Sequence, residues 1–345
     1  MKNRIEWIDA MSGVMILWMV LYHIFIFTGN KYSSACVGLY KFFYFFMPWF
    51  FYKSGMLAKQ IPVEKCFYQV YKDFLIPYLI FSFLGYLVYL VCLLMTESIT
   101  FDNIIIQPIY TLFYTGSILG NLPLWFLLAL GVDKIIWQLI LRFKVNKCVV
   151  AISSFILCFS DQFIDLPIPY YVWFTFSGLY FYSIGSIFKE IQFKKGVFSI
   201  AIILYSLSIL WYPNSVQMRS NTIEFGYYIF WPITSLSAII VWNNSLDYSY
   251  KRLIYKYSSS RTVWGGVKMA GEYSMPIYVC HALVLSPVSV LVGLASYRLS
   301  PSQQFWVVLC LCILIIPFAT KGSQYILKKA SLFFSKEYKP RLQTK

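Results

Sequence analysis

Long apolar runs follow one another along nearly the whole chain, separated by short polar stretches. A membrane-spanning helix needs about 20 mostly apolar residues, and ten segments reach or approach that length. The pattern therefore predicts an all-α polytopic membrane protein with about ten transmembrane helices. The predicted spans cover roughly residues 9–28, 37–58, 74–95, 121–141, 148–160, 166–188, 197–212, 225–243, 275–297 and 305–320.

The composition supports a membrane protein. Of the 345 residues, 59% are hydrophobic and only 12% are charged, whereas about 25% are charged in an ordinary soluble domain. So few charged side chains do not cover a soluble surface of this size. A disordered chain is also excluded, because disorder requires low hydrophobicity. Lipid is therefore the main solvent that we expect for this protein.

The basic residues indicate how the chain crosses the membrane. The net charge is +15, from 29 Lys and Arg against 14 Asp and Glu, but no zinc-finger spacing or dense basic helix points to nucleic acid. If the N-terminus is cytoplasmic, 23 of the 29 basic residues fall on cytoplasmic segments and three on outside loops. This bias obeys the positive-inside rule. It predicts a multi-pass protein of the inner (cytoplasmic) membrane with both termini in the cytoplasm, the last seven basic residues forming a tail from about residue 321.

The short loops predict that residues 1–345 form a single domain. The two longest, 96–120 and 244–274, are too short for a separate soluble domain, so chemistry is expected inside the helical bundle. The first span is longer than a signal-peptide core and no A-x-A site follows it, so we expect it to be retained. The eight cysteines include no C-x-x-C pair, and no metal site is predicted.

Both histidines of the chain fall inside predicted spans. His23 lies in the first span and His281 in the ninth. Ionisable side chains at that depth cost several kcal/mol, so they are candidates for a functional site by default. Histidine is also the natural proton carrier near neutral pH. The alternative for His23 is a structural histidine that is hydrogen-bonded between helices.

The first span presents a polar stripe when it is drawn as a helix. Asp9, Ser12 and His23 share one face, with Ile16 and Met19 between them. Ser12 and His23 lie three turns apart, or about 16 Å along the axis. Asp9 is alternatively a residue that caps the start of the helix, and the two roles are compatible.

Several blocks of sequence carry a resemblance to a known family. In order along the chain, they are Asp9 to His23, Met47-Pro48-Trp49-Phe50-Phe51 with Ser54-Gly55, Leu75-Ile76-Pro77-Tyr78, Leu124-Trp125-Phe126-Leu127, Phe176 to Gly185, and Ser274 to His281. Together they resemble the acyltransferase family 3 membrane O-acyltransferases. The resemblance covers nearly the whole chain, and ten spans with both ends inside are the arrangement of that family.

One position departs from the family pattern. Members of the family carry a basic residue eleven positions before the histidine, where this chain has Ser12. In relatives this basic residue is thought to assist the acyl donor near the cytoplasmic face, and serine supplies no positive charge. The candidate replacements are Lys53, near the cytoplasmic end of the second span, and Arg4; the alternative is a donor site that differs from that of the family. By itself, Lys53 is also explained as a side chain that reaches toward the lipid headgroups.

The resemblance implies an enzyme that moves an acyl group, usually acetyl, from acetyl-CoA or another acyl-CoA to a sugar hydroxyl. The acceptor is expected to be a surface polysaccharide, a lipopolysaccharide or a lipid-linked glycan. His23 is expected to be the general base or a transient acyl carrier, and His281 to orient the donor or act as a second acid/base. Asp9, Ser12 and Lys53 are assigned to the donor end, and Trp125 to the acceptor path.

Two other functions compete with this interpretation. A transporter or flippase for a polysaccharide intermediate also buries ionisable side chains, although the chain has no obvious internal repeat. A scaffolding subunit of a glycan-synthesis complex is the third hypothesis. Acylation of the glycan, with and without the gene, distinguishes the enzyme from both.

Overall fold

The structure is a bundle of helices. The computed structural model describes residues 5–96, 98–160, 170–189, 195–211, 230–249, 258–295 and 299–337. Helix accounts for 88% of the structure, and the described residues form no β-strand. The predicted all-α class is therefore confirmed. The first half of the chain forms α1 (Glu6–Phe27), α2 (Ser34–Phe43), α3 (Phe46–Met56), α4 (Val63–Val70), η1 (Tyr71–Leu75), α5 (Ile76–Met95), η2 (Asp102–Ile106), α6 (Gln107–Thr115), η3 (Leu122–Leu124) and α7 (Trp125–Arg142).

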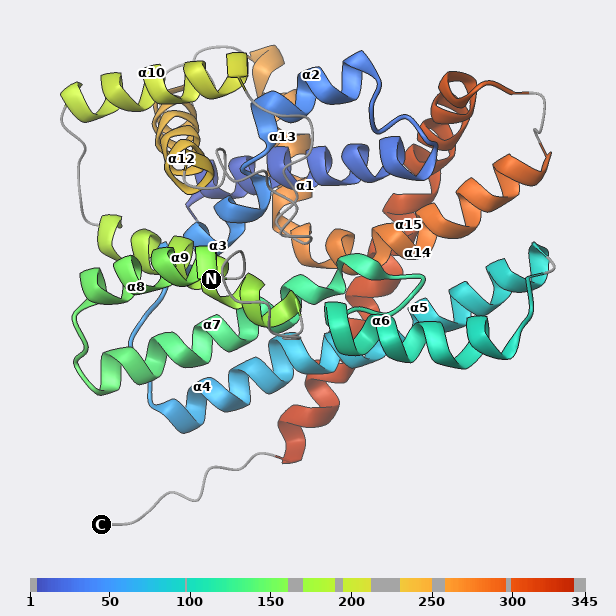
Figure 1. Cartoon of the computed structure of the whole chain (residues 1–345), viewed down its shortest axis with the longest axis horizontal. Coiled ribbons are helices and arrows are strands. Elements are labelled where there is room, and N and C mark those ends of the chain that lie inside the picture. Colours follow the sequence, from blue (N-terminus) through green and yellow to red (C-terminus); the bar gives the residue numbers. More distant parts are fainter. Residues whose placement is uncertain are drawn as a thin grey trace.

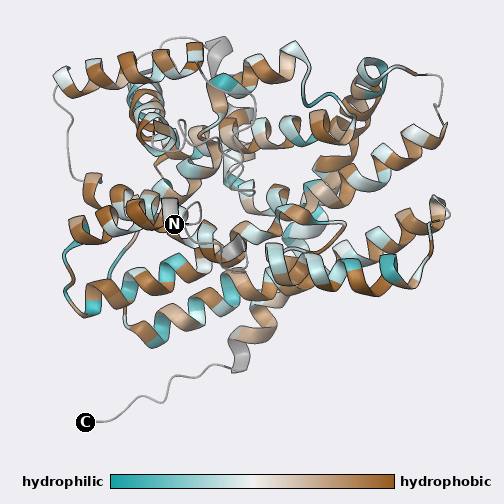
Figure 2. Ribbon diagram, viewed as in Figure 1, coloured by the Kyte–Doolittle hydropathy of each residue, from teal (hydrophilic) through white to brown (hydrophobic). Residues whose placement is uncertain are grey.

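The second half is helical as well, and hydrophobic residues extend along most helices (Figure 2). Within the described parts of the chain, five helices are long and apolar enough to cross a membrane: Glu6–Phe27, Val63–Met95, Leu122–Arg142, Ser274–Ala295 and Pro301–Phe334. Three shorter apolar helices add to them. The count of ten spans and the sides of the termini stay predictions. The second half contains α8 (Lys147–Ser160), α9 (Tyr170–Phe188), α10 (Lys195–Trp211), α12 (Phe230–Ser249), α13 (Ser258–Glu272), α14 (Ser274–Ala295) and α15 (Pro301–Glu337).

The second predicted span, 37–58, consists of two helices rather than one. Helix α2 ends at Phe43 and α3 begins at Phe46. Pro48 explains the break, because it has no N–H to donate to the carbonyl of Tyr44 and its ring clashes with that carbonyl in a continuous helix. The break frees α3 to take its own direction, which matters because α3 carries Lys53.

Some segments that the sequence assigns to loops are helical. The predicted outside loop 96–120 contains η2 and α6, and the predicted cytoplasmic loop 244–274 contains all of α13. The described part of the basic tail is helical too, since α15 spans 37 residues and ends at Glu337. At 1.5 Å per residue, α15 is about 55 Å long, which exceeds the roughly 30 Å hydrocarbon core of a bilayer.

Glycines let two pairs of helices approach closely. A Cβ added to Gly13 of α1 would lie 1.8 Å from the carbonyl oxygen of Val267 on α13, and one added to Gly271 would lie 1.7 Å from the carbonyl oxygen of Asp9. Gly55 of α3 lies equally close to α9, where an added Cβ would be 1.8 Å from the carbonyl oxygen of Tyr182. Small residues at such interfaces are how membrane helices pack without a hydrophobic driving force.

Helix α14 links the parts of the bundle that carry the two histidines. It packs against α1, α5 and α15, and in Figure 1 it begins near the middle of the molecule, where α1, α13 and α15 cross. Helix α1 lies between α13 and α14 and also contacts α3. These contacts bring His23 on α1 and His281 on α14 to the same place.

Candidate active site

The two histidines are in direct contact. The ring centroids of His23 and His281 are 4.9 Å apart, and the rings are tilted by 48°. His281 is completely buried, whereas His23 is half-buried. Two side chains separated by 258 positions in sequence therefore form one pair, where α1 packs against α14.

Backbone hydrogen bonds fix the tautomers of both rings. Nδ1 of His23 lies 2.9 Å from the carbonyl oxygen of Met19, and Nδ1 of His281 lies 2.6 Å from that of Tyr278. A carbonyl only accepts hydrogen bonds, so each Nδ1 carries the proton and each neutral ring has its lone pair on Nε2. Nε2 of His281 is buried and has no hydrogen-bond partner among the described residues.

Lys53 and Ser12 are also in contact. The ammonium of Lys53 donates a hydrogen bond of 2.6 Å to the hydroxyl of Ser12, and that hydroxyl donates to the carbonyl of Ile8 at 2.7 Å. Nζ of Lys53 also lies 5.5 Å from the centre of the Trp49 ring, a cation–π contact. A positive charge therefore lies beside position 12, although the residue at that position is serine.

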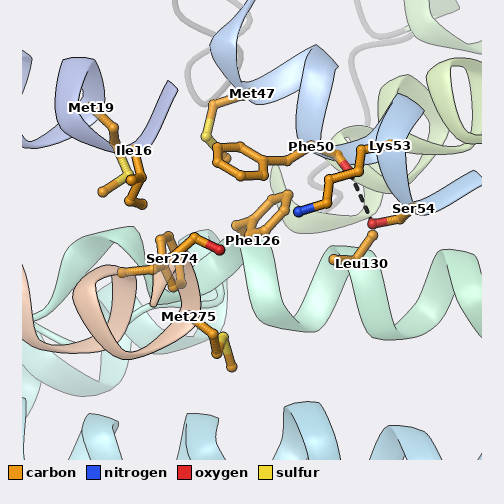
Figure 3. Close-up of a pocket in the computed structure, with 11 residues that line it drawn as sticks. Ile16, Met19, Met47, Phe50, Lys53, Ser54, Phe126, Leu130, Ser274 and Met275 are labelled. Carbon is orange, nitrogen blue, oxygen red and sulfur yellow. Dashed lines mark hydrogen bonds between the residues drawn. The ribbon is translucent and has the colours of Figure 1, made fainter. Parts of the chain in front are cut away.

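A cavity of about 150 Å³ opens beside Lys53 and is called the lysine cavity below. In Figure 3 the ammonium of Lys53 points from α3 into the space between Phe126 of α7 and the first turn of α14. Ser54 and Ser274 add hydroxyl groups to the wall. The positive end of the α14 dipole also faces this region. The lysine cavity is lined by Ile16, Met19, Met47, Phe50, Lys53, Ser54, Phe126, Leu130, Ser274, Met275 and Tyr278.

A second cavity of about 450 Å³, the histidine cavity, lies against the other half of α1. His23 and Lys31 provide its basic groups, and Trp125 and Trp231 contribute two of the eight Phe, Tyr and Trp side chains in its wall. His281 lines neither cavity. The histidine cavity is lined by Met19, Tyr22, His23, Ile26, Phe27, Lys31, Tyr40, Tyr44, Phe46, Met47, Pro48, Leu122, Pro123, Trp125, Trp231 and Tyr278.

Three side chains line both cavities and so form the junction between them. These are Met19, Met47 and Tyr278. Tyr278 is held on two sides, because its hydroxyl donates to the carbonyl of Pro123 and its ring packs edge-on against Phe126 at 5.5 Å. The two methionines are flexible by comparison. The predicted face of α1 therefore runs along both cavities, with Ile16 in one, His23 in the other and Met19 between them.

Asp9 lies beyond the lysine cavity, among charged residues at the start of α1. The helix begins at Glu6, so Asp9 is in its first turn rather than at the capping position, which Ile5 occupies. Lys268 of α13 forms an ion pair of 2.8 Å with Glu6. The hydrogen bond to Glu6 raises the pKa of Lys268, and the charge of Asp9 adds to this rise.

Two residues at the site were not singled out by the sequence analysis. Tyr278 forms part of the junction, and Ser274 places a hydroxyl in the lysine cavity. Both belong to the block that ends at His281, and Tyr278 precedes His281 by three positions, which places them on neighbouring parts of one helix face. That spacing was the available signal for Tyr278.

The comparison with known families decides what kind of protein carries this pair of histidines. A family model described as an acyltransferase domain matches residues 5–321. The chain belongs to the acyltransferase 3 family. No curated protein and no solved structure matches it at a significant level. The family supports a membrane acyltransferase in general terms.

The sequence blocks of this acyltransferase 3 protein meet around the cavities. The first block supplies Ser12 and His23, the second supplies Lys53, and the block around Trp125 supplies one wall of the histidine cavity. Gly55 of the second block and Gly185 of the block that begins at Phe176 lie where α3 packs on α9. The blocks therefore hold both the polar side chains and the helix contacts that position them.

Proposed function

We propose that this protein is a membrane O-acyltransferase that moves a short acyl group, acetyl in the first instance, from acyl-CoA to a sugar hydroxyl. The acceptor class is a surface polysaccharide or a lipid-linked glycan. One observation carries the proposal: a single face of α1 runs from the ammonium of Lys53 at Ser12, past the junction of two cavities, to the imidazole of His23. Donor and acceptor then approach His23 from opposite directions.

The lysine cavity suits the acyl donor. Coenzyme A carries several phosphate charges, and the ammonium of Lys53 together with the N-terminal end of α14 attracts anions. The charge distribution of the sequence predicts that this end of α1 lies at the cytoplasmic surface, where acyl-CoA is present. Lys53 thus takes over the basic role that relatives give to the residue at position 12, while Asp9 and Ser12 hold the polar end of α1 in place.

The histidine cavity suits the sugar. Its wall is rich in aromatic rings, including Trp125 and Trp231, and flat aromatic faces pack well against the C–H faces of sugar rings. A few polar groups among aromatic ones are typical of a small-molecule site. The cavity is about three times as large as the lysine cavity, which fits a sugar unit better than an acetyl group.

His23 performs the proton transfer in this proposal. Nε2 of His23 takes the proton of the sugar hydroxyl while the hydroxyl oxygen attacks the thioester carbonyl. A carbon–oxygen bond forms, the carbon–sulfur bond breaks, and the proton passes from His23 to the departing thiolate of coenzyme A. In the variant route, His23 first accepts the acyl group itself and then gives it to the hydroxyl.

His281 acts through His23. It is completely buried and touches neither cavity, so we assign it as a positioning residue that packs against the His23 ring. Its Nδ1 proton is committed to the carbonyl of Tyr278 and its Nε2 is buried away from both cavities, which leaves His23 as the base.

Mass spectrometry of the cell-surface glycan tests the proposed function. Cells that lack the gene receive the wild type, His23→Ala or Val132→Ala, all at matched expression. Val132 is 43% exposed and lines neither cavity, so its variant should acylate the glycan as the wild type does. We expect the His23 variant to lose O-acylation, and full acylation by that variant would disprove the role of His23.

The same experiment examines the competing transport function. A transporter or flippase predicts unchanged acylation of the glycan that reaches the surface, together with accumulation of an unexported intermediate in the cell. An acyltransferase predicts normal export of a glycan that lacks acyl groups. Glycan amount and acyl content are therefore measured in the same samples.

A further inference from the structure

A third hollow lies on the opposite side of α1 from the two cavities. It has a volume of about 660 Å³ and is enclosed by α1, α13, α14 and α15. Leu17 and Ile24 line it from α1, and Leu309 and Pro317 line it from α15. None of its lining residues is acidic. We call it the α15 groove.

The length of the α15 groove matches one leaflet of a bilayer. On α15 its wall runs from Leu309 to Lys321 and Gln324, and the twelve steps from Leu309 to Lys321 cover about 18 Å of helix. Half of the hydrocarbon core of a bilayer is about 15 Å thick. The groove therefore accommodates an extended hydrocarbon chain that belongs to a single leaflet.

One end of the groove is polar and positively charged. Lys321 and Gln324 line that end, next to Thr320, and Lys321 forms no hydrogen bond or ion pair with any other described residue. The basic residues of the sequence predict that this end of α15 lies at the cytoplasmic surface. An ammonium at the headgroup level, above an apolar groove, matches the charge distribution of an anionic phospholipid.

We propose that the α15 groove is a binding site for one anionic phospholipid of the cytoplasmic leaflet. An acyl chain lies along α15 between α1 and α13, and the headgroup phosphate lies at the ammonium of Lys321. The bound lipid fills the space behind the helix that carries His23. This site is separate from both cavities of the proposed reaction, because it shares no lining residue with them.

Two neighbouring glycines of α13 provide a matched pair of variants. Gly266 lines the groove and Gly265 does not, while a Cβ added to either meets no atom within 4 Å. Gly266→Leu therefore places a side chain in the groove with no clash at its Cβ, and Gly265→Leu makes the same change outside it. Lys321→Gln removes the headgroup contact, and Lys328→Gln, further along the same helix and outside the groove lining, is its control.

Native mass spectrometry of the purified full-length protein measures the binding. Dioleoyl phosphatidylglycerol is compared with dioleoyl phosphatidylcholine, which has the same chains and no net charge. We expect the wild type to prefer the anionic lipid, Lys321→Gln to weaken its binding about fivefold, equivalent to about 1 kcal/mol for one basic residue, and Gly266→Leu to lower it further. Gly265→Leu and Lys328→Gln should bind as the wild type does.

Several outcomes overturn the proposal. Equal binding of the two lipids by the wild type contradicts a charged headgroup site. Loss of selectivity in Lys321→Gln with no effect of Gly266→Leu places the headgroup contact outside the groove. Equal effects of the two glycine variants show a change in helix α13 rather than in lipid binding, and circular dichroism on the same samples reports whether each variant is folded.

Discussion

The two halves of α1 have opposite surroundings. The first half, from Glu6 to about Ile16, is held by close and polar contacts: Gly13 lies against the backbone of α13, Ser12 accepts from Lys53, and Glu6 pairs with Lys268. The second half lines a cavity of about 450 Å³ whose wall is rich in aromatic side chains. One helix therefore combines a fixed end with an end that has room for a ligand.

This difference shows how a membrane helix can place a reactive group accurately without enclosing it. His23 is half-buried and borders open space, yet its ring is held by the carbonyl of Met19 and by the ring of His281. The rigid first half sets the rotation of α1, and the second half presents the imidazole to the cavity. Groups that take part in chemistry need such support from well-packed neighbours.

The largest expected effect tests the second half of α1. We expect His23→Ala to reduce acyl transfer about 10²- to 10⁴-fold, as loss of a general base does. We expect His281→Ala to reduce it about 10²-fold by misplacing the His23 ring. The double variant should then be no worse than His23→Ala alone, because the two residues act as a unit. Acyl transfer by purified variants from radiolabelled acetyl-CoA measures this, and multiplicative losses would show independent roles.

The next effect tests the polar contact of the first half. Lys53→Ser should raise KM for acyl-CoA about tenfold, since a hydrogen bond to a charged group contributes about 1.5–3 kcal/mol. Exchange of the two residues, Ser12→Lys with Lys53→Ser, restores the charge with little change in volume and should recover most of the affinity. Lys134→Ser serves as the control, because Lys134 bonds to Gln69 and lines neither cavity. If the exchange variant has a KM for acyl-CoA as high as that of Lys53→Ser, a positive charge at this position does not bind the donor.

A stability effect tests the close packing of the first half. Gly13→Ala puts a methyl group against the carbonyl of Val267, and overpacking of this kind costs about 1–3 kcal/mol. Gly38→Ala on α2 meets no atom within 4 Å and should stabilise the protein by about 0.5–1 kcal/mol through helix propensity. Denaturant unfolding in detergent, followed by circular dichroism, gives both free energies. If both variants change the free energy of unfolding in the same direction, the close packing at Gly13 is not what limits the size of the residue there.

The smallest expected effect concerns the ion pair at the start of α1. Glu6→Gln should cost less than about 1 kcal/mol, because both partners are partly exposed. The pKa of Lys268 is raised above its usual 10.5 by Glu6, so the pair stabilises the folded state below that pH and loses its effect as the pH rises through the folded-state pKa. The unfolding free energies of wild type and variant should therefore differ at pH 7, begin to converge near pH 10.5 and coincide once the pH exceeds the raised pKa of Lys268. A difference that persists in strong alkali would point to packing rather than charge.

Much of the fold and part of the site were predictable from local sequence. Apolar runs of about 20 residues predict helices that are surrounded by lipid. The spacing of Ser12, Met19 and His23 places these residues on one helix face. From the sequence, Lys53 and Arg4 were the candidates to replace the basic residue that position 12 lacks. The contact between Lys53 and Ser12 supports Lys53, and Arg4 lies outside the described residues.

Other features depended on contacts between distant segments. The break between α2 and α3 has a local signal in Pro48, but α13 was interpreted as a loop because it is too polar for a span. Its helix is stabilised by packing of Gly271 and its neighbours on α1. Hydropathy measures affinity for lipid, and it does not detect a helix that is held by another helix.

The sequence by itself determined that the protein is a helical membrane protein of the acyltransferase 3 type with two histidines inside apolar segments. Periodicity and hydropathy suffice for the helices and their apolar character, and the ordered sequence blocks carry the family resemblance; all of these are local properties of the sequence. The tertiary structure decided that His23 and His281 share one contact, that His23 alone faces a cavity, and that Lys53 brings its charge to Ser12. Those facts depend on how α1, α3 and α14 cross, and the crossing is set by glycine contacts and side-chain packing across hundreds of residues, which no local pattern encodes.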